Sequence, residues 1–213
     1  MKKTLYSLML SDDVVREIDI LAHRMGTNRS NLVNQILAER VSLRTPEQQI
    51  NDIFRELHEL LSPSRDIVPF FEPNTPTMSL KSCLEYKYRP TVRYEVELFG
   101  TLRGNAVGGL SVIFRTQSAA LIDAMASFFR LYKHIEDTYL ASGFRHDYAL
   151  YDGKFERSIV CTRDMTSREL ALAINNYVTL FDTLMKRYIS GAINADRVAA
   201  EYASALREGK IVI

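Results

Sequence analysis

The sequence predicts an α+β protein built from a small N-terminal module, a connecting helix and a larger C-terminal domain. One short alternating segment and two short helical patterns precede residue 46. Four prolines then fall between residues 63 and 76, which favours an extended linker. Beyond them, strands, a helix, a hairpin and further helices follow in an irregular order, which is typical of α+β domains. The predicted divisions are 1–45, 46–61, 62–76 and 77–213.

The composition is that of a globular protein, with 46% hydrophobic and 25% charged residues. The net charge of +1 argues against a chain that binds nucleic acid along its whole length. The charge is uneven, however, because residues 1–45 carry seven Lys/Arg against five Asp/Glu, whereas residues 46–61 carry one against four. The two cysteines are too few for a disulfide scaffold, and no apolar run could span a membrane, so we expect a cytoplasmic protein.

The N-terminal module is predicted to contain one strand and two helices. Residues 3–10 alternate, and the apolar set on one side of this strand is Tyr6, Leu8 and Leu10. Ser11 can cap a helix that starts at Asp12, Gly26 ends it, and Asn28 can cap the second helix. About forty residues of this kind cannot bury a core alone, and a single strand leaves its backbone unpaired. A homodimer that pairs two such strands solves both problems.

The connecting helix is predicted over 46–61, because Pro46 suits the first helical position and apolar residues recur at three- and four-residue spacing. The C-terminal domain then opens with alternating strands over 80–88 and 92–98. The elements predicted after them are a glycine-rich loop over 100–109, a strand over 110–115, a helix over 117–141, a hairpin over 147–161 that turns at Asp152-Gly153, helices over 167–190 and 195–208, and a short strand over 211–213.

The N-terminal pattern resembles the ribbon-helix-helix family of bacterial and archaeal DNA-binding proteins, which includes the Arc, MetJ and CopG-type repressors. The resemblance covers residues 2–43 and depends on the strand, on Gly26 and on the segment Thr27-Asn-Arg-Ser-Asn-Leu-Val33. It implies a homodimer whose two-stranded ribbon enters the major groove of double-stranded DNA. The base-facing residues would be Leu5, Ser7 and Met9, and the phosphate-contacting residues would be Lys2, Lys3, Asn28, Arg29 and Ser30.

The ribbon departs from the family at its base-facing positions, which are normally rich in Arg, Lys, Asn, Gln or Thr. Here Ser7 offers one hydroxyl between two apolar side chains. Leu5 and Met9 can contact thymine methyl groups, but they cannot form the bidentate hydrogen bonds that distinguish guanine or adenine. Recognition of DNA shape is therefore the alternative to direct readout.

No catalytic residues, cofactor or metal site are predicted. The glycine-rich loop lacks a P-loop ending, and the histidines and cysteines show no ligand spacing. Asp147 and Asp152 lie near His146, but no nucleophile and base accompany them. The tyrosines of the predicted strands could line a small-molecule pocket or pack helices against the sheet; they are Tyr86, Tyr88, Tyr94, Tyr148 and Tyr151.

Together these features predict a dimeric, sequence-specific DNA-binding transcriptional regulator, in particular a repressor. Its C-terminal domain would sense a small-molecule or protein effector, or would build a higher oligomer. Two alternatives remain open. One is a structural or interaction protein whose N-terminal module only dimerises, and the other is an accessory DNA-binding protein of plasmid maintenance or conjugation.

Overall fold

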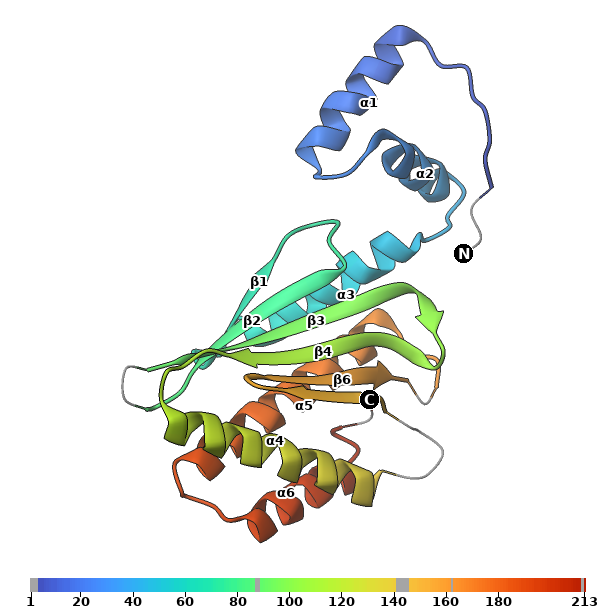
Figure 1. The fold of residues 1–213 in the computed structure, drawn as a ribbon. Coiled ribbons are helices and arrows are strands. Elements are labelled where there is room, and N and C mark those ends of the chain that lie inside the picture. The colour runs from blue at the N-terminus through green and yellow to red at the C-terminus, as the bar shows by residue number, and fades with distance from the viewer. Residues whose placement is uncertain (1–3, 87–88, 141–145, 162, 212) are drawn as a thin grey trace.

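The computed structural model describes every residue except 1–3, 87–88, 141–145, 162 and 212. The described residues form six helices and one six-stranded sheet, which confirms the α+β class. Figure 1 shows helices α1 (Asp12–Arg24) and α2 (Arg29–Arg40) lying apart from the sheet. The remaining four helices lie beside the sheet and form one domain with it.

The sheet has the strand order β1-β2-β3-β4-β6-β5, and each neighbouring pair is antiparallel. Its strands are β1 (Ile67–Phe71), β2 (Thr77–Cys83), β3 (Thr91–Arg103), β4 (Ala106–Phe114), β5 (Tyr148–Tyr151) and β6 (Lys154–Val160). Burial alternates along the central strands, because one face carries the core side chains and the other is polar and open. On the open face, Arg93 pairs with Glu95 at 3.3 Å.

Helices cover the apolar face; they are α3 (Pro46–Leu61), α4 (Ala119–Tyr139), α5 (Ser167–Ile189) and α6 (Ala195–Arg207). The ring of Phe181 on α5 lies 5.3 Å from that of Phe128 on α4 and 5.5 Å from that of Phe155 on β6. These three rings are fully buried. The core therefore sits between α5 and the sheet, and α6 packs on the outside of α4 and α5.

Local capping signals place these helices where the sequence predicts them. Thr45 and Gln48 form a capping box at α3, and Thr166 and Glu169 form one at α5. An ion pair with Arg163, together with the cap hydrogen bonds, lowers the pKa of Glu169 to about 2. The hairpin of β5 and β6 turns at Asp152-Gly153 as predicted, with the glycine at φ +77°.

The segment 62–76 differs from the predicted linker, because it contains strand β1. Pro69 lies in that strand opposite Leu80, and the sheet tolerates it because β1 is an edge strand. The phenyl ring of Phe71 in β1 stacks edge-on against that of Phe54 in α3 at 5.5 Å. The predicted connecting helix and linker thus pack with the C-terminal strands, and we call residues 46–213 the sheet domain.

The predicted loop over 100–109 is mostly strand, since β3 continues to Arg103 and β4 begins at Ala106. Only Gly104-Asn105 remains as the turn. A Cβ atom at Gly108 would lie 2.3 Å from the main-chain oxygen of Glu97, so this glycine permits β3 and β4 to approach closely. In the segment 211–213, where a strand is predicted, Ile211 and Ile213 are buried but belong to no strand, and Val212 lies outside the described residues.

The N-terminal strand predicted over 3–10 is likewise not formed by the described residues 4–10. Residues 4–10 are extended but belong to no strand, so the ribbon-helix-helix fold of the N-terminus is not confirmed. In a single chain this segment has no neighbour with which to form a ladder. No helix among the described residues is long and apolar enough to cross a membrane.

Candidate nucleic-acid interface

The N-terminal module contains the predicted pair of helices, although the Ser11 side chain forms no cap hydrogen bond at the start of α1. Helix α1 ends at Arg24, and Gly26 turns the chain with φ +62°, a conformation that favours glycine. The Asn28 side chain then accepts a hydrogen bond from the main-chain N–H of Asn31 at 2.9 Å, which caps α2. The helix, glycine, cap and second helix thus follow one another as the sequence predicts.

This module leaves most of its apolar surface uncovered. In the part that the structure describes, Ala22 and Leu32 are its only fully buried apolar residues. Its exposed large apolar residues are Leu5, Tyr6, Leu8, Met9, Leu10, Val14, Ile20, Leu21, Met25, Ile36, Leu37, Val41 and Leu43. An apolar surface of this extent on so few residues is typical of a chain that buries it against another molecule.

Residues 4–10, which we call the arm, run past α2 with two unlike sides. The side chains of Leu5 and Met9 are 97% and 102% exposed, whereas those of Leu8 and Leu10 are 55% and 44% exposed. Tyr6, Leu8 and Leu10 line a groove of about 840 Å³ beside α2, which Leu5 also lines, while Ser7 and Met9 lie outside it. The alternation predicted for a strand is therefore partly present in the arm without a partner strand.

The predicted phosphate-contacting residues gather at the start of α2, except for Lys2 and Lys3, which lie outside the described residues. Arg29 forms a two-pronged ion pair with Asp19 of α1, with Nε–Oδ1 at 2.6 Å and Nη2–Oδ2 at 2.5 Å. This hydrogen bonding lowers the pKa of Asp19 and raises that of Arg29. Ser30, the next residue after Arg29, is exposed. The Asn28 side-chain oxygen already accepts the hydrogen bond that caps α2.

The electrostatic attraction that this module offers to DNA is small. Residues 4–45 carry five arginines and five acidic residues. Arg16 pairs with Asp13 at 3.4 Å, and Arg44 pairs with Asp52 of α3 at 3.0 Å. Phosphate binding would therefore depend on the main-chain N–H groups and dipole at the start of α2 more than on free cations.

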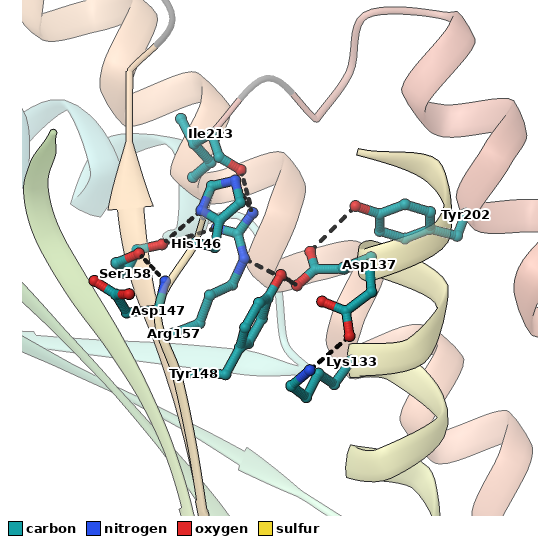
Figure 2. Close-up of polar contacts among 10 residues, drawn as sticks. Lys133, Asp137, His146, Asp147, Tyr148, Arg157, Ser158, Tyr202 and Ile213 are labelled. Atoms are coloured by element: carbon teal, nitrogen blue, oxygen red, sulfur yellow. Dashed lines mark hydrogen bonds and ion pairs between the residues drawn. The ribbon is translucent and has the colours of Figure 1, made fainter. Parts of the chain in front are cut away.

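A second polar cluster lies in the sheet domain, between the β5–β6 hairpin and the helices. Figure 2 shows the Arg157 and Tyr148 side chains reaching from the sheet toward α4. Arg157 Nε donates to Glu136 Oε2 at 3.0 Å, and both side chains are fully buried. The hydroxyl groups of Tyr148 and Tyr202 donate to the same carboxylate at 2.8 and 3.1 Å.

The far end of the Arg157 guanidinium contacts the last described residue. Its Nη2 donates to the main-chain oxygen of Ile213 at 2.5 Å and lies 3.3 Å from His146 Nε2. The guanidinium also stacks 4.4 Å from the ring centre of Tyr177. Burial and the nearby Arg157 charge lower the pKa of His146. Because these groups bind one another, the cluster joins α4, α6, β5 and β6 rather than presenting a ligand site.

This cluster is not among the sites predicted from the sequence, although the sequence carries two signals of it. Arg157 occupies an inward position of β6 between Phe155 and Ile159, and Glu136 lies one helical turn after Tyr132 in the apolar stripe of α4. Charged residues at core positions of a strand and a helix predict a buried pair.

Two of the strand tyrosines pack helices against the sheet, which is one of their two predicted roles. Tyr94 is buried and donates to Asp182 of α5 at 2.8 Å, so it packs a helix against the sheet, as Tyr148 does. Tyr86 and Tyr151 are exposed, and Tyr88 lies outside the described residues. Within the described ranges, no group of three or more His, Cys, Asp or Glu residues is arranged to hold a metal ion.

Comparisons with known proteins add no relative: no family model, no curated protein and no solved structure matches this chain. The functional interpretation therefore depends on the geometry of the N-terminal module.

Proposed function

We propose that the protein is a homodimeric, sequence-specific DNA-binding repressor of transcription whose N-terminal module is a ribbon-helix-helix domain. The observation that carries this proposal is the arm, an alternating apolar segment that its own chain leaves largely uncovered, directly before two helices of which the second is capped by Asn28. Exposed apolar side chains at strand spacing are stabilised when a second copy pairs with them.

Pairing of two arms would provide hydrogen-bond partners for their main chains and would cover their exposed apolar side chains. An antiparallel two-stranded ribbon would supply hydrogen-bond partners to the main chain of the arms. It would also bring Leu8 and Leu10 of each copy onto α2, where Leu37 and Val41 are exposed in the single chain. Such a dimer buries the apolar surface that remains uncovered here.

The opposite side of the ribbon would then face DNA with Leu5, Ser7 and Met9. Because Ser7 is the only hydrogen-bonding side chain of these three, base contacts would be few, and DNA shape would contribute to specificity. The start of α2 would bind a phosphate group, with Asp19 holding the Arg29 guanidinium in place. The sheet domain would serve as the sensing or assembly domain.

The test is fluorescence anisotropy with duplex DNA from upstream of the protein's own gene, against unrelated competitor DNA. Three cations per chain (Lys2, Lys3 and Arg29) limit the dimer to about six phosphate pairs, so the plot of log K against log salt should have a slope no steeper than about −5. Arg29→Ala should weaken every sequence alike, whereas Ser7→Ala should change the site preference. Arg168→Ala, which removes an exposed charge from α5, is the matched control.

If unrelated competitor DNA abolishes all binding to the upstream duplex, the proposal is contradicted. A dimer that shows only such binding would support the alternative in which the module serves for dimerisation alone.

A further inference from the structure

The imidazole ring of His146 connects the start of β5 to β6. His146 precedes β5 by two residues and is only 8% exposed. Its Nδ1 lies 3.1 Å from the main-chain oxygen of Ser158, and its Nε2 lies 3.3 Å from Nη2 of Arg157. Figure 2 shows the ring beside both residues. Two consecutive residues of β6 thus bind the two nitrogen atoms of one ring.

These two contacts fix the protonation state of the ring. A carbonyl oxygen can only accept, so Nδ1 carries a proton that it donates to Ser158. A guanidinium group can only donate, so the lone pair of Nε2 accepts from Arg157. The ring is therefore neutral, with its one proton on Nδ1. A second proton could bind only at Nε2, where it would replace the hydrogen bond from Arg157 with two N–H groups that face each other.

The charged groups around the ring oppose that second proton. The nearest charge is the Arg157 guanidinium of β6, which Glu136 of α4 holds at 3.0 Å. Burial, and after it the Arg157 charge, disfavour protonation of His146. The Ser158 oxygen, Glu136 and Asp147 favour protonation less strongly, so the pKa of the ring is lowered.

The tyrosines around the cluster add no charge near neutral pH. They are Tyr148 of β5, Tyr177 of α5 and Tyr202 of α6, and burial raises the pKa of each hydroxyl group. The chain after α6 contributes Ile211 and Ile213, whose side chains are buried and apolar. In the part of the chain that the structure describes, the charges that face the ring are therefore the guanidinium and the two carboxylates named above.

We propose that His146 is an acid-sensitive switch of the sheet domain: the neutral ring holds the start of β5 against Arg157, and the protonated ring leaves this contact and releases the start of β5. A protonated ring that stayed in place would put two positive charges 3.3 Å apart in a site that is almost closed to solvent. Arg157 does not move away, because it is the partner of the buried Glu136 carboxylate. The inference concerns the sheet domain alone and does not depend on DNA binding.

The test is hydrogen exchange of main-chain amides in the full-length protein, followed by nuclear magnetic resonance at pH 7.5 and 5.5 and corrected for the intrinsic exchange rates. The N–H group of Ser158 donates to the main-chain oxygen of Asp147 at 2.9 Å, so its exchange reports opening at the start of β5. The amide of Tyr94, in the inner strand β3, reports unfolding of the whole domain.

Two variants separate the ring of His146 from other titrating groups. In His146→Gln, an uncharged side-chain oxygen can accept from Arg157 at any pH. His134→Gln, at an exposed position of α4, is the matched control. In the open state the ring of His146 titrates with an ordinary pKa of about 6.5, whereas the closed state excludes the proton. Closure is therefore favoured above this pH and weakens below it, so the opening equilibrium constant should rise about tenfold between pH 7.5 and 5.5.

We expect this tenfold rise at Ser158 in the wild type and in His134→Gln, and no rise in His146→Gln. A rise of less than about twofold in the wild type overturns the proposal, and so does an equal rise in His146→Gln. Exchange at Ser158 that is no faster than at Tyr94 also overturns it, because only the whole domain would then open. The nitrogen resonances of the wild-type ring decide the matter even if His146→Gln does not fold: a proton on Nε2 at pH 7.5 refutes the switch.

Discussion

Removal of Arg157 should destabilise the sheet domain more than the loss of any single surface ion pair. Its guanidinium and the Glu136 carboxylate are both fully buried and 3.0 Å apart. Burial by itself lowers the pKa of Arg157, but Glu136 and the surrounding tyrosines reverse this effect, so the net shift is upward. The guanidinium is therefore held charged in a fully buried site, where its charge is balanced by one carboxylate.

The expected magnitudes follow from this burial. Arg157→Met would leave the Glu136 carboxylate buried with only the hydroxyl groups of Tyr148 and Tyr202 as donors. Stranding one partner of a buried pair costs about 3–5 kcal/mol. The double variant Glu136→Leu with Arg157→Met removes both charges and keeps a similar volume, so it should be less destabilised than Arg157→Met alone. Its remaining cost is the hydrogen bonds lost by the two tyrosines and by Ile213, about 1 kcal/mol each.

The assay is urea unfolding of the wild type, both single variants and the double variant, followed by far-ultraviolet circular dichroism at pH 7 and one protein concentration. A fixed concentration is needed because dimerisation makes the apparent stability depend on it. A loss of less than about 1 kcal/mol in Arg157→Met, the value of an exposed ion pair, would contradict a coupled buried pair. So would single effects that add up to the double effect, since a coupled pair cannot be additive.

Three further predictions concern the arm, the α5 cap and the β3–β4 approach. Leu8→Lys should abolish the dimer in sedimentation experiments, whereas Leu5→Lys, on the exposed side of the arm, should preserve it. The ion pair to its neighbouring arginine holds the pKa of Glu169 at about 2, below the ordinary value of 4.5. The stabilisation is therefore complete above about pH 5 and is lost as the pH falls toward 2, so the urea midpoints of wild type and Glu169→Gln should converge at low pH. Gly108→Ala should destabilise by about 1–3 kcal/mol because of its clash with the neighbouring strand, whereas Gly109→Ala, where the nearest atom is 3.8 Å away, should be close to neutral in thermal melts.

The sequence predicts the elements whose signals are local. The helix boundaries agree with the structure to within two or three residues, because Thr45, Asn28 and Thr166 act on amides of their own first turns. The β5–β6 hairpin is equally local, since Asp152-Gly153 alone dictates its turn. In each of these cases one short stretch of chain determines the conformation.

Features that depend on distant residues could not be predicted in this way. The four prolines of the segment 62–76 predict a linker, and only pairing with β2 makes its residues 67–71 the strand β1. A glycine is required at position 108 of β4 because the main-chain oxygen of Glu97 in β3 leaves no room for a Cβ atom, and not because the chain needs to be flexible there. In the candidate site, the ion pair between Arg29 and Asp19 joins two helices, so it depends on how α1 and α2 pack and not on either local pattern.

Dimerisation through the arm needs room beside α2, in the groove that Leu8 and Leu10 line. Pro46, Glu47, Gly100 and Thr101 of the sheet domain line the same groove. Paired arms would therefore lie against the sheet domain as well as against α2. The hydrogen bond from Asn74 Nδ2 to the main-chain oxygen of Met25 lies elsewhere, at the C-terminal end of α1, so its loss should leave the packing of Leu8 and Leu10 unchanged.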